Sequence, residues 1–326
     1  MKECILITGG AGFIGLNLID YILKHNKYRI IVLDNLSYGN LELLKKIARK
    51  YKANYSTNIE DLKSDLIFVK GDIRDKNLEP LFKRSDYVIH LAAQTGVIPS
   101  IKDPFKDAEI NVLGTLNLLN YSVRFKIKKF IFSSSAAPLG EQTPPLNENK
   151  IPSPLSPYGA SKLSGEGYCS AFYGSYGLKT VVLRFSNVYG RYSYHKGSVV
   201  AEFFKRIINN KPIFVYGDGN QTRDFIFAEE LSSAIISAIE KEESSGNIFQ
   251  LGTGIETSVN TLVSYIKEVV ERDLKVEYKP ARKGEIRRNY TSIEKAKKLL
   301  GFKPAVELKK GLELTYKWFL KEGGLF

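Results

Sequence analysis

Two residues with complementary proton chemistry stand four positions apart in the middle of the chain. Tyr158 and Lys162 lie in the stretch 156–162, SPYGASK, which begins an expected helix that runs to about residue 176. Residues four apart share one face of a helix. An ammonium group near a phenol favours the phenolate and lowers the pKa of the tyrosine from about 10. Tyr158 is therefore a candidate general base and acid, activated by Lys162.

Such a pair is also frequent on exposed helices, so its meaning depends on what accompanies it. An expected strand over 129–132 leads into the run Ser133 to Ser135, and a glycine-rich stretch typical of phosphate-binding loops lies at the N-terminus. A hydroxyl, a phenol and an ammonium together with a dinucleotide site favour a catalytic role. We therefore expect Ser135, Tyr158 and Lys162 to act together.

The N-terminal stretch 5–15, ILITGGAGFIG, predicts that phosphate-binding site. An apolar run typical of a buried parallel strand is followed by a glycine-rich turn, and helical periodicity begins at Phe13. Gly9 allows a sharp turn, Gly12 leaves room for a pyrophosphate, and Gly15 lets the helix pack closely on the strand. The free N–H groups of the first helical turn would then face the anion.

A second apolar strand, over 29–33, ends in Asp34. An acidic residue at this place accepts hydrogen bonds from the adenosine ribose hydroxyls and would repel a 2′-phosphate. We therefore expect NAD rather than NADP. The alternative is an ordinary turn between a strand and a helix, with a surface aspartate.

Strands alternate with helices through the first half of the chain, which predicts a doubly wound parallel sheet with ligands at the carboxyl ends of its strands. Asp72 and Ile73 follow the strand expected at 66–69, and Ala92 and Ala93 follow the strand expected at 86–90. Asp72 could equally cap the next helix. A single long helix is expected at 105–124, and residues 53–64 show no periodicity.

The composition of the 326-residue chain is that of a globular protein. Its net charge of +13 arises from Lys and Arg residues scattered over expected helix faces, which does not indicate a nucleic-acid-binding stripe but favours an anionic substrate. We expect no membrane span and no leader. Cys4 and Cys169 show no metal-ligand spacing and are expected to be buried free thiols, which suits the cytoplasm.

Taken in order, these motifs resemble those of extended short-chain dehydrogenases/reductases, and within them the nucleotide-sugar epimerase/dehydratase group that includes UDP-galactose 4-epimerase. The matching segments are TGGAGFIG at 8–15, DNLS at 34–37, GDI at 71–73, LAAQ at 91–94, SSSA at 133–136 and SPYGASK at 156–162. The resemblance implies an α/β Rossmann fold, with an NAD-binding domain over 1–185. It also implies a smaller substrate lobe over 186–326, some segments of which return to the sheet.

The resemblance also implies which residues contact NAD. They are Gly9, Gly12, Phe13, Ile14, Gly15, Asp34, Asn35, Asp72, Ile73, Leu91, Ala92, Ala93, Tyr158 and Lys162. The implied reaction is 4-epimerisation of a UDP-linked sugar without net redox change. Tyr158 would take the proton of the sugar 4-hydroxyl while a hydride passes to the nicotinamide, and Ser135 would hydrogen-bond the reacting oxygen. The 4-keto sugar would then turn over and take the hydride back on its other face.

Substrate contacts are implied in the second half of the chain. Asn187, Arg223 and Arg282 resemble family residues that bind the diphosphate, and Glu285 resembles one that binds the nucleoside ribose. Arginine suits phosphate because its fork donates two parallel hydrogen bonds. Taken singly, the two arginines could as well be surface residues. A homodimer is expected, held by the helices at 105–124 and 156–176.

Departures from the family pattern leave alternatives open. Ala136 and Ala137 stand where dehydratases carry an acid pair, so 4,6-dehydration is not expected. Arg191, His195 and Lys196 could receive a C6 carboxylate, which would make the protein a UDP-glucuronate 4-epimerase or decarboxylase. The same three residues could simply lie in a solvated loop. A nucleotide-sugar reductase and a non-catalytic NAD-binding protein are the remaining alternatives.

Overall fold

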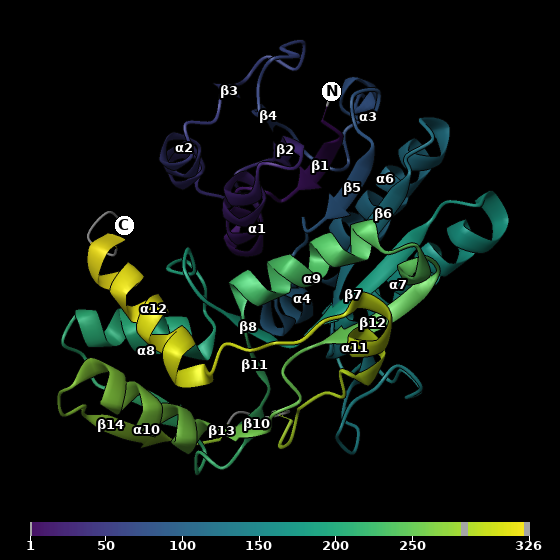
Figure 1. Cartoon of the computed structure of the whole chain (residues 1–326). Coiled ribbons are helices and arrows are strands. Elements are labelled where there is room, and N and C mark those ends of the chain that lie inside the picture. Colours follow the sequence, from purple (N-terminus) through teal and green to yellow (C-terminus); the bar gives the residue numbers. More distant parts are fainter. Residues whose placement is uncertain (1, 282–285, 323–326) are drawn as a thin grey trace.

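The centre of the molecule is a sheet of eight parallel strands in the order β12-β7-β6-β5-β1-β2-β4-β3 (Figure 1). The computed structural model describes residues 2–281 and 286–322. The strands of the sheet are β1 Cys4–Thr8, β2 Arg29–Asp34, β3 Tyr55–Ser56, β4 Leu66–Lys70, β5 Tyr87–His90, β6 Lys129–Ser135, β7 Thr180–Phe185 and β12 Asn247–Leu251. The expected doubly wound parallel fold is therefore confirmed, and β3 lies within the stretch that showed no periodicity.

Helices cover both faces of this sheet. The first face carries α1 Phe13–His25, α2 Leu41–Lys50 and α9 Ala228–Glu240, and the second carries α3 Glu79–Phe82, α6 Gly114–Arg124 and α7 Pro157–Tyr176. Successive strand residues point to opposite faces. Ile5 and Ile7 of β1 accordingly join the first core, and Cys4 and Leu6 join the second. Burial on both faces explains why the strands are continuous apolar runs.

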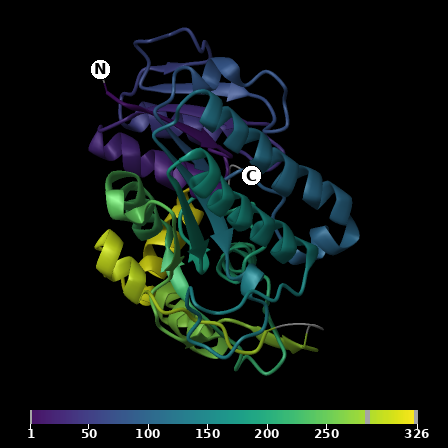
Figure 2. The same ribbon diagram turned by 90° about the vertical axis from the view of Figure 1, so that its right-hand side faces the viewer.

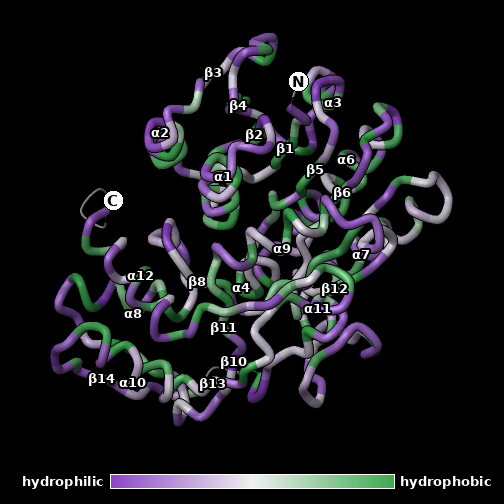
Figure 3. The backbone as a smooth tube through the Cα atoms, viewed as in Figure 1, coloured by the Kyte–Doolittle hydropathy of each residue, from purple (hydrophilic) through white to green (hydrophobic). Residues whose placement is uncertain are grey.

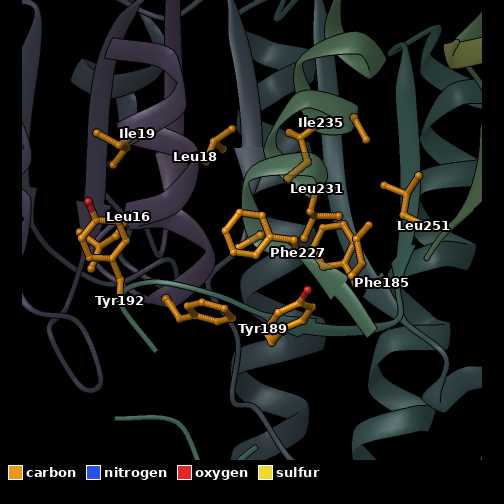
Figure 4. Packing of buried hydrophobic residues seen from close by; sticks show 14 of the residues in the cluster. Leu16, Leu18, Ile19, Phe185, Tyr189, Tyr192, Phe227, Leu231, Ile235 and Leu251 are labelled. Atoms are coloured by element: carbon orange, nitrogen blue, oxygen red, sulfur yellow. The ribbon is translucent and has the colours of Figure 1, made fainter. Parts of the chain in front are cut away.

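The first core joins α1 to α9, which lie side by side over the sheet. Figure 4 shows Leu18 of α1, Ile235 of α9 and Leu251 of β12 among the residues of this core. Along most helices hydrophilic and hydrophobic residues alternate (Figure 3), as expected for helices with one face on a core. In residues 2–281 and 286–322, no helix has the length and apolar character of a membrane span.

The chain order creates a crevice between β1 and β5. After β1 the chain forms β2, then the edge strand β3 and then β4 between them, all on one side of β1, and it crosses to the other side of β1 to form β5. Thr8 and His90, the last residues of β1 and β5, are partners in register. Ligands of such sheets bind outside the carboxyl ends of the strands at this reversal.

After β7 the chain builds a smaller lobe beyond the carboxyl edge of the sheet (Figure 1). Its strands pair two by two: β8 Asn187–Tyr189 with β11 Phe225–Phe227, β9 Ile213–Tyr216 with β14 Val276–Lys279, and β10 Thr222–Arg223 with β13 Thr257–Ser258. Its helices are α8 Val199–Ile208, α10 Val259–Val270 and α12 Leu308–Glu322. β12 returns to the main sheet beside β7, with α11 Glu294–Leu300 against it.

The single helix expected at 105–124 is wrong in detail. The structure has α5 Pro104–Ala108, a π-helical turn Glu109–Leu113 and then α6, preceded by a short helix α4 Val97–Lys102 that the sequence did not predict. The turn centres on Asn111, whose side chain bonds to Gln94 and Ser161 rather than facing solvent. Helices α5, α6 and α7 lie side by side at the outside of the molecule (Figure 2).

Both cysteines are buried free thiols, as expected. Burial raises the pKa of Cys4 to about 12 and also raises the pKa of Cys169. Because the thiolate is the reactive form, neither residue is a candidate nucleophile.

Candidate active site

A pocket of about 300 Å³ opens at the carboxyl edge of the sheet. Its walls come from the start of α1, the residues after β5, the end of β6, the first turns of α7 and the segment 185–200. The residues expected from the sequence that line this pocket together are Phe13, Ile14, Leu91, Ala93, Ser135, Tyr158, Lys162 and Asn187. Residues up to 174 positions apart in the sequence thus meet where a doubly wound sheet binds its ligands.

Ser135 and Tyr158 line the pocket together, and the Ser135 hydroxyl lies close enough to the Tyr158 phenol to lower its pKa. Ser135 is the last residue of β6, and Ser156 caps α7 by accepting a hydrogen bond of 3.1 Å from the Gly159 amide. This cap begins the helix so that its first turn brings Tyr158 to the end of the strand. Burial raises the pKa of Tyr158, and the Ser135 hydroxyl partly opposes that shift.

Lys162 lies one turn further along α7 and is buried. Its Nζ donates a hydrogen bond of 2.9 Å to the Ser133 carbonyl and lies 4.9 Å from the centre of the Phe132 ring. Burial lowers the pKa of Lys162 to about 8. The expectation that Lys162 lowers the pKa of Tyr158 is wrong for the protein alone. Loss of solvation dominates at the phenol, whose pKa is raised.

The glycine loop has the geometry that a pyrophosphate needs. Gly9 has φ of +70°, and a Cβ there would lie 2.6 Å from the Ala92 amide nitrogen. A Cβ on Gly15 would lie 2.5 Å from the Gly10 Cα, so only glycine lets α1 approach the loop. Within the described residues no side chain caps α1 at Gly12, and its first turn holds no acidic residue. The N–H groups there are thus available to an anion.

Asp34, the last residue of β2, is buried and keeps both carboxylate oxygens in hydrogen bonds. Its two carboxylate oxygens accept hydrogen bonds from the Ala11 amide at 2.9 Å and the Leu36 amide at 2.8 Å. Burial raises its pKa, and these two hydrogen bonds partly oppose the shift. A carboxylate accepts about four hydrogen bonds, so two ribose hydroxyls can still bind. A 2′-phosphate would meet a buried negative charge.

Asn35 and Asp72 come together beside Asp34. The Asn35 amide donates to Asp72 at 2.9 Å, and the Arg74 guanidinium forms an ion pair of 2.8 Å with the same carboxylate. The hydrogen bond from Arg74 lowers the pKa of Asp72 to about 2. Asp72 does not cap a helix, because the next helix begins only at Glu79. Ile73 is buried and lies against α6, where a Cβ on Gly114 would touch it.

Three buried polar residues to which the sequence analysis gave no role, His90, Thr8 and Thr115, contact one another next to the site. His90 lies between two threonines, with Nδ1 2.7 Å from Thr8 Oγ1 and Nε2 3.0 Å from Thr115 Oγ1. Burial lowers the pKa of His90 to about 3, so the ring is neutral. Thr8 Oγ1 also accepts a hydrogen bond from the Ala92 amide. The sequence signals for these residues are a histidine ending an apolar strand and Asn111 inside a helix, where asparagine is unfavourable.

The structure separates the expected substrate residues. Asn187 begins β8 and lines the pocket, whereas Arg223 lies on β10 with Nη1 donating to the Thr222 and Ile286 carbonyls. Arg191 lies outside the pocket, where its guanidinium pairs with Glu229 at 3.0 Å and Asp20 at 3.5 Å. Arg282 and Glu285 lie outside the described residues.

Lys196 is the member of the expected cationic group that lines the pocket. Its Nζ lies 5.9 Å from the centre of the Phe13 ring, and burial lowers its pKa. Burial, with a smaller effect of Lys196, lowers the pKa of His195 to about 4. His195 is therefore neutral near pH 7 and offers no positive charge to an anion.

Known proteins with the same architecture carry related names. A UDP-N-acetylglucosamine 4-epimerase from Methanobrevibacter ruminantium, solved with UDP-N-acetylmuramic acid, superimposes with a TM-score of 0.89 at 33% identity, over 99% of this chain and 100% of that chain. The UDP-glucose 4-epimerase of Thermotoga maritima, solved with UDP-glucose, gives 0.86 at 38% identity, over 98% and 99%. A UDP-glucuronate 4-epimerase from Thermodesulfobacterium geofontis is 33% identical over 324 residues, covering 96% of this chain and 95% of that protein.

The family description "NAD dependent epimerase/dehydratase family" matches residues 5–252, which include the glycine loop, Asp34 and the Ser135, Tyr158 and Lys162 group. The geometry of the loop and of Asp34 fits the cofactor named in that description. The chain therefore belongs to the NAD-dependent epimerase/dehydratase family, and its cofactor is NAD.

Proposed function

We propose that the protein interconverts the two C4 epimers of a UDP-linked sugar, with Tyr158 as acid and base. The observation that carries this proposal is that Ser135, Tyr158 and Lys162 line one pocket together with the start of α1. The names of the relatives support the substrate class, since three different UDP-sugar 4-epimerases resemble the chain over nearly its whole length.

Each residue has a distinct task in this reaction. The Tyr158 oxygen receives the proton of the sugar 4-hydroxyl and later returns it, while Ser135 holds the same sugar oxygen by a hydrogen bond. Bound NAD supplies the acceptor for the hydride that leaves C4 and the donor that returns it to the other face. The Lys162 ammonium stabilises the phenolate. Asp34 holds the ribose, so the cofactor can remain bound through many turnovers.

The sugar must turn over within the pocket, so the strong contacts belong on the nucleotide. Asn187 lines the pocket at the start of the second lobe and is proposed to bind the diphosphate. Arg223, Arg282 and Glu285 are proposed to hold the diphosphate and the nucleoside. For Arg223 this requires a reorientation of the guanidinium, because its Nη1 donates to main-chain carbonyls.

The proposal is tested by incubating the NAD-loaded protein with UDP-glucose, UDP-N-acetylglucosamine and UDP-glucuronate and following each sugar by NMR. We expect one of them to equilibrate with its 4-epimer, and Tyr158→Phe to abolish the conversion while NAD stays bound. A reductase would instead consume one NADH for each sugar converted. A protein that keeps NAD and converts none of the three would contradict the proposal.

A uronate substrate is the second candidate, and one observation favours it. Lys196 places an ammonium group in the wall of the pocket, where a C6 carboxylate could meet it. Replacing Lys196 by Met should then raise KM for UDP-glucuronate much more than KM for UDP-glucose. Arg191→Met is the matched control, since Arg191 lies outside the pocket and pairs with Glu229. An equal effect of Lys196→Met on KM for both substrates would rule out binding of a C6 carboxylate by Lys196.

We also infer that the protein is a homodimer. Several large apolar side chains are exposed on the adjoining elements α5, the π-helical turn and α7, namely Phe105, Leu113, Tyr168, Tyr173 and Tyr176. Exposed apolar side chains that gather on adjoining helices mark association surfaces. A second copy of the chain would cover this face through the same elements of both protomers.

A further inference from the structure

A buried carboxylate with one oxygen left without a hydrogen-bond partner in the described chain lies near the proposed catalytic residues. Asp107, on α5, is only 1% exposed. Its Oδ1 accepts a hydrogen bond of 3.1 Å from the Asn111 amide, whereas its Oδ2 has no hydrogen-bond partner in the part of the chain that the structure describes. Burying an ionised carboxylate is costly unless another charge compensates it.

Hydrogen bonds through Asn111 connect Asp107 to Ser161 on α7. The amide of Asn111 that donates to Asp107 also donates to Ser161 Oγ at 3.1 Å. Ser161 is the neighbour of Lys162, and α5 packs against α7. Asn111 stands in the middle of the π-helical turn, a distortion that is frequent at functional sites. The turn therefore fixes Asp107 relative to the face of α7 that carries Tyr158 and Lys162.

Asp107 is the one uncompensated negative group among the titratable residues that face Lys162 in the described chain. Glu166, on α7, is engaged by Arg184 of β7 through hydrogen bonds of 2.8 and 2.6 Å. His90 of β5 is neutral, and Cys169 remains a thiol because burial raises its pKa. β6 contributes the Ser133 carbonyl and the Phe132 ring, which are uncharged.

We propose that Asp107 is a positioning residue, whose buried carboxylate is the counter-charge that keeps the Lys162 ammonium protonated beside Tyr158. The inference rests on the proposed function, because it gives Lys162 a task only if Tyr158 acts as the base. In the poorly screened interior a charge acts over several ångströms, so no direct ion pair is required. Asp107 raises the pKa of Lys162 against the dominant effect of burial, and it also raises the pKa of Tyr158.

The test is an NMR titration of NAD-loaded protein labelled at lysine Cε, in which the Lys162 signal is assigned by its loss in Lys162→Met. Removing the charge with Asp107→Asn should lower the pKa of Lys162 below its wild-type value, which burial sets at about 8. Asp103→Asn is the matched control, because Asp103 is an exposed residue one turn earlier and asparagine caps α5 equally well. We expect this control to leave the titration of Lys162 unchanged.

The kinetic counterpart is the pH dependence of turnover. The alkaline limb, where Lys162 loses its proton, should move to lower pH in Asp107→Asn, so kcat should fall several-fold at alkaline pH. KM should not change, because Asp107 lies outside the walls of the pocket. Asparagine keeps an oxygen for the Asn111 amide and removes a buried charge, so we expect the melting temperature not to fall.

Two results would overturn the inference. One is an unchanged Lys162 titration in Asp107→Asn, and the other is a fall in pKa of the same size in Asp103→Asn. If Asp107→Asn does not fold, Asp107→Ser removes the same charge and must give the same shift. The lysine titration needs no substrate, so it still gives its answer if no UDP-sugar is converted and the proposed function fails.

Discussion

Two opposing effects act on the phenol of Tyr158. Burial raises its pKa, and the nearby Ser135 hydroxyl lowers it. A general base works only when it is deprotonated, so turnover should rise with pH through this pKa. The pH at which the protein becomes active is therefore set partly by a neighbouring hydroxyl.

Ser135→Ala should accordingly shift the acid limb of the kcat/KM profile to higher pH. It also removes a donor to the reacting sugar oxygen, which should lower kcat/KM at neutral pH by about 10²-fold. The measurement is a pH–rate profile of the sugar that proves to be the substrate. Ser164→Ala is the control, since Ser164 is exposed on α7 and, among the residues that the structure describes, bonds only to the Ala160 carbonyl. An acid limb that stays in place would show that Ser135 does not tune Tyr158.

Asp34 should decide the choice of cofactor. Asp34→Asn removes the negative charge and keeps one oxygen, which can accept from the Ala11 amide or the Leu36 amide but not from both, because the NH2 group only donates. Hydrogen bonds to charged groups contribute about 1.5–3 kcal/mol, so NAD affinity should fall about tenfold or more. NADP should lose less affinity, because its 2′-phosphate is no longer repelled. Calorimetric titration of both nucleotides into cofactor-stripped protein measures the ratio, and an unchanged ratio contradicts the assignment.

At the scale of elements, a buried lysine joins β6 to α9. The Lys129 ammonium donates to the Ala238, Ile239 and Lys241 carbonyls at 3.2, 2.9 and 2.7 Å, where α9 ends. The last carbonyls of a helix have no intrahelical partner and carry partial negative charge. The cation thus fixes the end of α9 against the strand that leads to Ser135.

Lys129→Met should destabilise the fold by about 2 kcal/mol, because it leaves buried carbonyls without a donor. Lys128→Met is the control at the adjacent position. Lys128 is half exposed and pairs with Glu3 and Asp86 at the surface, so its loss should cost at most about 1 kcal/mol. Thermal unfolding of both variants measures the difference. Equal melting temperatures would mean that water replaces the ammonium at the end of α9.

Elements specified by local signals could be predicted from the sequence. The glycine loop and the start of α7 are examples, because Gly9 permits its own φ of +70° and Ser156 caps its own helix. The π-helical turn could not be predicted, because it depends on contacts of Asn111 with Gln94 and Ser161, up to 50 positions away. Arg191 illustrates the same limit, since its partners are on α1 and α9.

At the scale of the whole molecule, main-chain hydrogen bonds connect the two lobes. The loop between β6 and α7 bridges to the second lobe at Leu146, whose amide donates to the Tyr290 carbonyl and whose carbonyl accepts from Ser292. Buried Asp224 accepts hydrogen bonds from Thr253, Gly254 and Thr291 close by. The loop that follows Ser135 is therefore fixed by both lobes, which keeps the proposed catalytic serine in register with Tyr158.

The inferred dimer predicts a change in mass. Phe105 is 82% exposed on α5 and Tyr176 is 62% exposed on α7. Replacing both with Asp would place charges in the apolar interface, where desolvation is costly, so the double variant should be a monomer. Light scattering during size-exclusion chromatography should give twice the 36.7 kDa chain mass for the unaltered protein and one chain mass for the variant. Ile255→Asp, at an equally exposed apolar residue beyond β12, should remain dimeric. A double variant that keeps the dimer mass would place the interface elsewhere, because two buried aspartates without partners are incompatible with a stable contact through these helices.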